Sequence, residues 1–289
     1  MPTVYDVTTW THSTNPAITC YTDIGALINN IIAKIKQDQP NQASKPGAVI
    51  YIPPGDYPLK TRVTVDISCL TIKGSGHGFT SSSIRYNTSN TASWHELWPG
   101  GSRVKVENAD GRSEAFLVTR TGDPRLSSVV FKEFCLDGVS FSPDQNSYRN
   151  GKFGIKVDTA NDAFRIEGMG FVYLEHALTV RDADALSISG NFIAECGSCI
   201  ELVGSGQASK VTDNLIGAGY VGFSIFAEPA RGAPRDRQQH LSAGQELRSL
   251  QEREPLVDHR QPTPRLLPRN DRLRGRQQGE PDQRQPPPA

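Results

Sequence analysis

The sequence has no long hydrophobic run, no excess of either charge and no regular set of cysteines. No apolar stretch approaches the roughly 20 residues that a membrane-spanning helix needs. The first residues, MPTVYDVTTW, lack the basic and then apolar layout of a signal peptide. Lys and Arg together number 31, as do Asp and Glu, so charge gives no argument for nucleic acid or for an anionic membrane. We therefore expect no nucleic-acid partner, no membrane partner, and a ligand that is neutral or weakly charged.

The five cysteines are an odd number scattered over the chain, which argues against a disulfide framework. Cys196 and Cys199 form a CxxC pair, but a zinc site would need a second pair or histidines at ligand spacing, and the sequence has neither. We predict that both are small buried apolar residues. A redox or metal role is the alternative. No metal and no cofactor is expected.

The composition changes abruptly near residue 227. All ten lysines lie before this point, whereas 12 of the 21 arginines lie after it, and residues 228–289 contain no Ile, Phe, Tyr, Trp, Cys or Lys. Such a segment cannot bury enough apolar surface to offset the entropy of ordering it. We interpret it as the product of a shifted reading frame, with a natural disordered tail as the alternative. In both cases this segment, Arg/Pro/Gln-rich and about 60 residues long, is excluded from the fold.

One helical pattern opens the ordered part. Within residues 23–36, apolar residues recur at steps of three and four, and Asp23 is the expected N-cap. Short strands are expected next, separated by tight turns. They lie in 48–57, where a short apolar strand is stopped by the Pro-Pro-Gly turn at 53–55, and at 63–65 and 70–72. The glycine-rich residues 74–78 are interpreted as another turn, because no phosphate-binding Lys-Ser/Thr follows them.

An internal repeat indicates the fold class. Three segments align at offsets of 22 and 23 residues: 166–171, 188–193 and 211–216. A second strand follows each of them: 177–180, 199–202 and 223–226. This period, with several short strands per turn, is typical of a parallel β-helix, in which each rung offers its backbone hydrogen-bonding groups to the next. Asn191 and Asn214 fall at one position of successive rungs, which predicts a ladder of side-chain amides.

We therefore predict an all-β fold: a right-handed parallel β-helix of the pectin-lyase-like kind with an N-terminal capping helix. A leucine-rich repeat has a similar period, but its signature leucines and asparagine spacing are absent. The expected domains are an N-terminal segment with the capping helix (1–45), the rungs (46–227) and the tail (228–289). The helix covers the end of the stack, where strand edges would otherwise be unpaired.

Carboxylates are the side chains of the repeat best suited to chemistry on carbohydrate. Breaking an acetal bond takes one group that donates a proton and another that accepts one or stabilises positive charge. The repeat holds seven: Glu167, Glu175, Asp182, Asp184, Glu195, Glu201 and Asp213. Asp184 and Glu195 flank strands of one rung, so we expect both at its corners, facing outward over a shared groove. Solvated turn acids without function are the alternative.

The chain resembles the bacterial inulin fructotransferases in six stretches: 49–57, 122–126, 134–138, 168–178, 183–186 and 193–197. The resemblance runs from Val4 to Glu228 and covers only the N-terminal part of a family member. It implies a homotrimeric β-helix that removes the terminal difructose unit of inulin, a β-2,1-linked fructan. The reaction is an intramolecular fructosyl transfer that releases a difructose dianhydride and consumes no water, hence the class of lyase.

The same resemblance implies a catalytic pair at Asp184 and Glu195, with Glu195 as the acid/base and Asp184 as its partner. The expected product is difructose anhydride III rather than I, and the expected location is extracellular. Since no signal peptide is seen, a cytoplasmic location is the alternative. Two other functions stay open: hydrolysis of difructose anhydride III, and carbohydrate binding by a non-catalytic β-helix.

Overall fold

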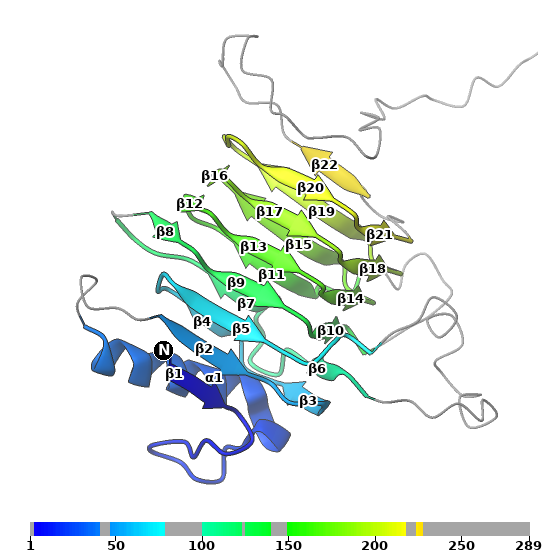
Figure 1. Ribbon diagram of the computed structural model, residues 1–289. Coiled ribbons are helices and arrows are strands. Elements are labelled where there is room, and N and C mark those ends of the chain that lie inside the picture. The colour runs from blue at the N-terminus through cyan, green and yellow to red at the C-terminus, as the bar shows by residue number, and fades with distance from the viewer. Residues whose placement is uncertain are drawn as a thin grey trace, which may run out of the picture. The chain divides into compact units, whose positions relative to one another are not determined.

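The computed structural model describes residues 3–40, 47–78, 100–122, 125–139, 149–217 and 224–227. The predicted tail, 228–289, lies outside these ranges, and so does residue 223, the start of the last predicted strand. In the described part, short strands stack coil upon coil with parallel pairing (Figure 1). The predicted parallel β-helix is confirmed.

Three long sheets and one short sheet run along the stack. Sheet A has seven strands: β1 (Thr3–Asp6), β2 (Ala48–Tyr51), β5 (Leu70–Lys73), β9 (Val130–Lys132), β13 (Arg165–Glu167), β17 (Ser187–Ser189) and β20 (Lys210–Thr212). Sheet B has six: β3 (Gly55–Leu59), β6 (Ser102–Val106), β10 (Cys135–Asp137), β14 (Gly170–Val172), β18 (Phe192–Ala194) and β21 (Leu215–Ile216). Sheet C has six: β4 (Val63–Val65), β7 (Glu114–Val118), β11 (Phe153–Val157), β15 (His176–Arg181), β19 (Ser198–Val203) and β22 (Ile225–Ala227). Sheet D has three: β8 (Leu126–Ser127), β12 (Asn161–Asp162) and β16 (Ala183–Asp184).

Each coil runs through sheet A, then B, then C, and passes through sheet D, where that is present, before it returns to sheet A. We name the turns by the sheets they join. In the coil that starts at β13, the A–B corner is residues 168–169, the B–C corner is residues 173–175, and the C–A corner is residues 182–186. These corners place the candidate site residues.

The predicted repeat matches the observed register of sheet A. Ile166 pairs with Ile188, and Ile188 pairs with Val211, at the offsets read from the sequence. One expected strand is displaced. The predicted alignment of 199–202 with 223–226 would pair Ile200 with Ser224, but Ile200 pairs with Ile225, so the register is displaced by one residue.

The predicted amide ladder is present at the A–B corner. Nδ2 of Asn191 donates to Oδ1 of Asn214 at 2.8 Å and to the carbonyl oxygen of Ile166 at 2.9 Å. The backbone N–H of Asn191 also donates to Oδ1 of Asn214, and both asparagines are buried. Buried peptide groups of the corner therefore find partners in the neighbouring coil, which keeps this turn the same from coil to coil.

The core consists of inward-facing residues stacked in columns. One column of sheet A is Ile72, Phe131, Ile166 and Ile188. One column of sheet B is Tyr57, Val104, Leu136, Phe171 and Ile193. One column of sheet C is Phe116, Ile155, Leu178 and Ile200. Each such side chain contributes about 1.5–3 kcal/mol through burial, so the strands are held by stacking rather than by their own length.

The single helix of the described residues, α1 (Cys20–Asp38), lies against β2, β3 and β4 (Figure 1). All six predicted apolar positions are buried: Ile24, Leu27, Ile28, Ile31, Ile32 and Ile35. Asp23 has extended backbone angles, and its Oδ1 accepts from the N–H groups of Gly25 and Ala26. Thr19 is the N-cap of α1 as a whole, in a capping box with Thr22, whereas Asp23 lies at a kink and caps the longer helical segment that follows it. The capping role of the helix is confirmed.

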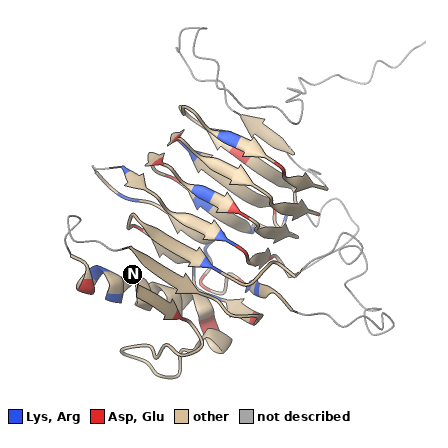
Figure 2. Cartoon of the chain, viewed as in Figure 1, with Lys and Arg blue, Asp and Glu red and all other residues tan. Residues whose placement is uncertain are grey.

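The glycine-rich residues 74–78 begin the connection from β5 to β6, which takes residues 74–101, so they start a long connection and do not form the predicted tight turn. A Cβ at Gly74 would lie 2.3 Å from the carbonyl oxygen of Glu133 in the next coil, so only glycine fits there. On the strands seen in Figure 2, Lys and Arg residues are interspersed with Asp and Glu. This agrees with the equal numbers of acidic and basic residues in the sequence.

Candidate active site

Asp184 is the last residue of β16, at the C–A corner. Its side chain is 30% exposed, and its Oδ2 accepts from Arg125 NH1 at 2.6 Å. The same guanidinium donates through NH2 to the backbone carbonyl oxygens of Asn161 and Asp182. Arg125 therefore holds the Asp184 carboxylate against the corner with a charge-assisted hydrogen bond.

Glu195 directly follows β18, at the B–C corner. It is 6% exposed and has a φ of +51°. One coil earlier, Tyr173 follows β14 with a φ of +58°, so the left-handed conformation belongs to this corner and is not peculiar to the acid. The conformation directs the chain from sheet B into sheet C and sets Glu195 at the turn between them.

The two acids occupy different corners of the coil. Their spacing of eleven residues is half of the 22-residue offset between coils, so they lie half a coil apart. The C–A corner follows β15 and the B–C corner precedes its neighbour β19, so sheet C separates them. The six residues of β19 span about 20 Å. One chain therefore does not bring these carboxylates over a shared groove, which differs from the sequence expectation.

A polar cluster on sheet C lies beside the Glu195 corner. The rings of Phe153 and His176 stack with centroids 4.2 Å apart and planes inclined by 22°. His176 Nδ1 lies 3.0 Å from Glu201 Oε2, to which Thr179 Oγ1 donates at 2.7 Å. Burial raises the pKa of Glu201, but the hydrogen bonds from His176 and Thr179 outweigh it and bring that pKa below its ordinary value.

The sequence reasoning included Glu201 among seven acids and missed His176 as a functional candidate. Glu175, another of the seven, lies near the same ring, with Oε1 3.9 Å from His176 Nε2. His176 could have been noticed in the sequence because it is the first residue of a repeated strand. It occupies the position that Ser198 occupies one coil later. The contact with Glu201 joins residues 25 positions apart, which no local pattern specifies.

Another charged group lies on sheet B. Asp137 is 2% exposed, with its Oδ2 2.9 Å from Arg103 Nε, and Asp56 binds Lys105 at 2.7 Å in the neighbouring coils. Burial raises the pKa of Asp137, and Arg103 opposes this only in part. The ion pair neutralises a buried carboxylate, so we assign it a structural role.

The CxxC pair behaves as predicted. All five cysteines are free, and Cys196 and Cys199 are buried. Burial, with a smaller effect from Glu195, raises the pKa of Cys196 to about 12, which leaves it uncharged at neutral pH. Within the described ranges no group of three or more His, Cys, Asp or Glu side chains is arranged to hold a metal ion. No helix there is both long and apolar enough to cross a membrane.

The solvent exposure of each cysteine predicts how readily its thiol reacts. Only Cys69 is exposed, whereas Cys20, Cys135, Cys196 and Cys199 are buried. Because a thiol reacts as its thiolate and must be reached, Ellman's reagent should modify one cysteine per native chain, at Cys69, and all five after unfolding. Peptide mapping identifies the labelled site. Rapid native labelling of Cys196 or Cys199 would contradict their placement in the core.

Comparison with known proteins gives specific relatives, although no protein-family model matches the chain. Over 234 residues, 80% of its length, the chain is 58% identical to the inulin fructotransferase (DFA-I-forming) of Arthrobacter globiformis, and it covers 58% of that protein. A solved structure of DFA-IIIase from Arthrobacter chlorophenolicus A6 in complex with DFA-III superposes with a TM-score of 0.69 at 57% identity, over 78% of this chain and 53% of that one. The same enzyme without its lid gives 0.68 at 58% identity, over 78% and 57%. The chain thus spans little more than half the length of these relatives.

Proposed function

We propose that this chain is a bacterial inulin fructotransferase and that it acts on inulin as a fructotransferase of the lyase class, because the 80% of its length that aligns is 58% identical to such an enzyme. The 58% identity over 234 residues carries the proposal. Its stacked coils and its two corner acids are what such an enzyme needs as scaffold and as chemical groups. A neutral substrate also fits a chain with equal numbers of acidic and basic residues.

The reaction exchanges one bond for another within the substrate. The bond from the anomeric carbon of the second fructose to O1 of the third breaks, and a hydroxyl of the terminal fructose bonds to that carbon. The departing O1 receives a proton from Glu195, and the Glu195 carboxylate then takes up the proton that the attacking hydroxyl gives up, so the acid is restored and no water is consumed. We assign Asp184 to assist this attack through the positive, oxocarbenium-like state.

Two carboxyl groups that serve one glycosidic bond lie about 5–9.5 Å apart. Within one chain, Asp184 and Glu195 are separated by the width of sheet C, roughly 20 Å, which is too far for both to act on one bond. We therefore propose that Asp184 of one subunit faces Glu195 of the next in a closed ring, for which the family resemblance implies a homotrimer. A ring repeats one interface around its axis, so each junction receives one acid from each neighbour.

Product analysis tests the function. The full chain is incubated with inulin in water enriched in ¹⁸O, and the products are separated by anion-exchange chromatography and identified by ¹³C NMR. We expect a difructose dianhydride without ¹⁸O, because the nucleophile is a hydroxyl of the substrate. Difructose anhydride III stays our prediction, and the NMR spectrum distinguishes it from the I form.

The alternatives give other results in the same assay. A hydrolase converts added difructose anhydride III into an ¹⁸O-labelled difructose, and a carbohydrate-binding β-helix leaves both compounds unchanged. Either outcome would replace the proposal. Secretion belongs to the same proposal, since inulin is a polymer that must be met outside the cell, and fractionation of a culture of the producing cells tests it.

A further inference from the structure

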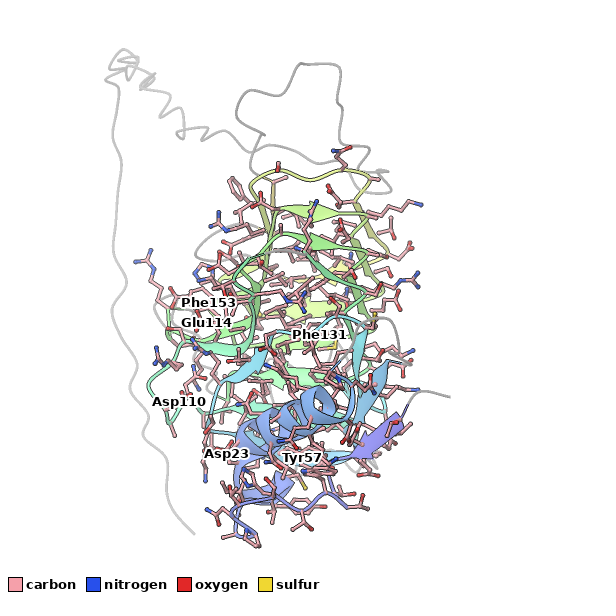
Figure 3. All side chains as sticks on the ribbon, turned by 90° about the vertical axis from the view of Figure 1, so that its left-hand side faces the viewer. Asp23, Tyr57, Asp110, Glu114, Phe131 and Phe153 are labelled. Atoms are coloured by element: carbon pink, nitrogen blue, oxygen red, sulfur yellow. The ribbon has the colours of Figure 1, made fainter. Side chains whose placement is uncertain are left out.

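The outer face of sheet C carries a row of side chains that starts beside Glu195. Glu114, Phe153, His176 and Ser198 are the first residues of four successive strands, paired in register from coil to coil. Ser198 comes three residues after Glu195, so the row borders the B–C corner. Figure 3 shows Glu114 and Phe153 close together on one side of the stack, with Phe131 inside it. The row is therefore the part of sheet C that begins where the corner of Glu195 ends.

The row is held rigidly by its own contacts. Phe153 and His176 stack at 4.2 Å, and His176 Nδ1 lies 3.0 Å from the Glu201 carboxylate. Thr179 donates to the same carboxylate, as does the hydroxyl of Ser198. The side chains of His176 and Glu201 are only 27% and 17% exposed. A ligand that binds here would find the groups already in place, which reduces the entropy lost on binding.

The shape and chemistry of the row fit a sugar ring. The stacked rings of Phe153 and His176 offer a flat apolar surface. Ser198, one coil further along the stack, is buried and adds a hydroxyl that donates to Glu201. The Glu201 carboxylate accepts hydrogen bonds from hydroxyl groups, and the imidazole can donate or accept. Glu114 is paired with Arg62 and Lys156, whereas Glu175 and Glu201 both lie beside the His176 ring. The two carboxylates at the ring favour a neutral polyhydroxy ligand over an anionic one.

We propose that Phe153, His176 and Glu201 form a subsite that binds a fructosyl unit of the chain next to the one held at Glu195. This rests on the proposed function for the identity of the sugar. The site is a binding site without a step of its own: the rings pack against one face of the furanose, and Glu201 accepts its hydroxyls.

Binding of short-chain inulin, measured by isothermal titration calorimetry in the Glu195→Gln chain, tests this inference because the probe is not consumed there. Adding Phe153→Ala should raise the Kd about tenfold, since it removes the stacking surface. Adding Glu201→Gln, which keeps the shape and removes the charge, should raise it about fivefold. The controls are Tyr21→Ala, an exposed aromatic on α1, and Glu167→Gln on sheet A, which should stay within about twofold.

The outcomes separate the two proposals. If the Glu195→Gln chain binds inulin and both added variants bind it equally well, the subsite is refuted and the proposed function stands. If the parent chain itself binds no inulin, the proposed function is refuted as well. Light scattering measures the molecular mass of each variant in solution. If a variant binds inulin more weakly and also has a smaller mass than the parent assembly, the row is a contact between subunits, and the subsite is refuted.

Discussion

Replacing Glu195 by Gln should reduce the release of dianhydride from inulin by about 1,000-fold, because an amide cannot transfer the proton that the departing oxygen needs. Gln has nearly the same shape, so the B–C corner and its left-handed backbone are retained. The rate is measured by chromatography of the product, and thermal unfolding followed by circular dichroism checks the fold. Glu167→Gln is the matched control, since Glu167 lies on sheet A away from the B–C and C–A corners.

Asp184→Asn should be as inactive as Glu195→Gln. Mixing the two variants tests whether the two acids of one active site come from the same chain or from neighbouring subunits. If the acids come from neighbouring subunits, a junction is complete when one variant supplies Asp184 and its neighbour supplies Glu195. Random assembly of equal amounts into closed rings then restores about a quarter of the wild-type activity. If the pair acted within one chain, the mixture would stay inactive, and the proposed junction would be wrong. Full activity of either single variant would remove that residue from the catalytic pair.

Replacing Asp23 by Ala should lower the free energy of unfolding by about 3–5 kcal/mol, because one carboxylate ties the cap to the first coil. Its Oδ1 accepts from the backbone N–H groups of Gly25, Ala26, Lys60 and Thr61, and its Oδ2 accepts from the Thr61 hydroxyl at 2.6 Å. Figure 3 shows Asp23 beside the helix at the end of the stack where Tyr57 lies. Removal leaves several partly buried donors without their acceptor.

Urea unfolding followed by circular dichroism measures this loss. Asp38→Ala is the matched control: Asp38 also lies on α1, but it is 43% exposed and its contacts are with Lys34 and Tyr5 near the surface, so its removal should cost about 1 kcal/mol or less. The same urea midpoint for Asp23→Ala and the wild type would show that the helix is held by its apolar face alone, and that the carboxylate contacts contribute nothing net.

Local pattern was enough to predict the stack. The offsets joining Ile166, Ile188 and Val211 became register partners, and Asn191 and Asn214 formed the ladder expected of them. The capping helix buried every predicted apolar position. These features could be predicted because a β-helix repeats one short-range arrangement: each residue meets its counterpart one coil away, so a period in the sequence is also a contact in space.

The tertiary structure alone decided where the chemistry lies. The corners of Asp184 and Glu195 depend on how many residues each strand and turn uses, and a repeat period does not specify that. The contacts of His176 with Glu201 and of Asp23 with Thr61 join side chains 25 and 38 residues apart. Such contacts are not periodic, because they depend on rotamers and corner geometry that differ from coil to coil. The sequence by itself therefore determined the architecture and the chemical types of the site residues, whereas their distances follow only from the folded coil.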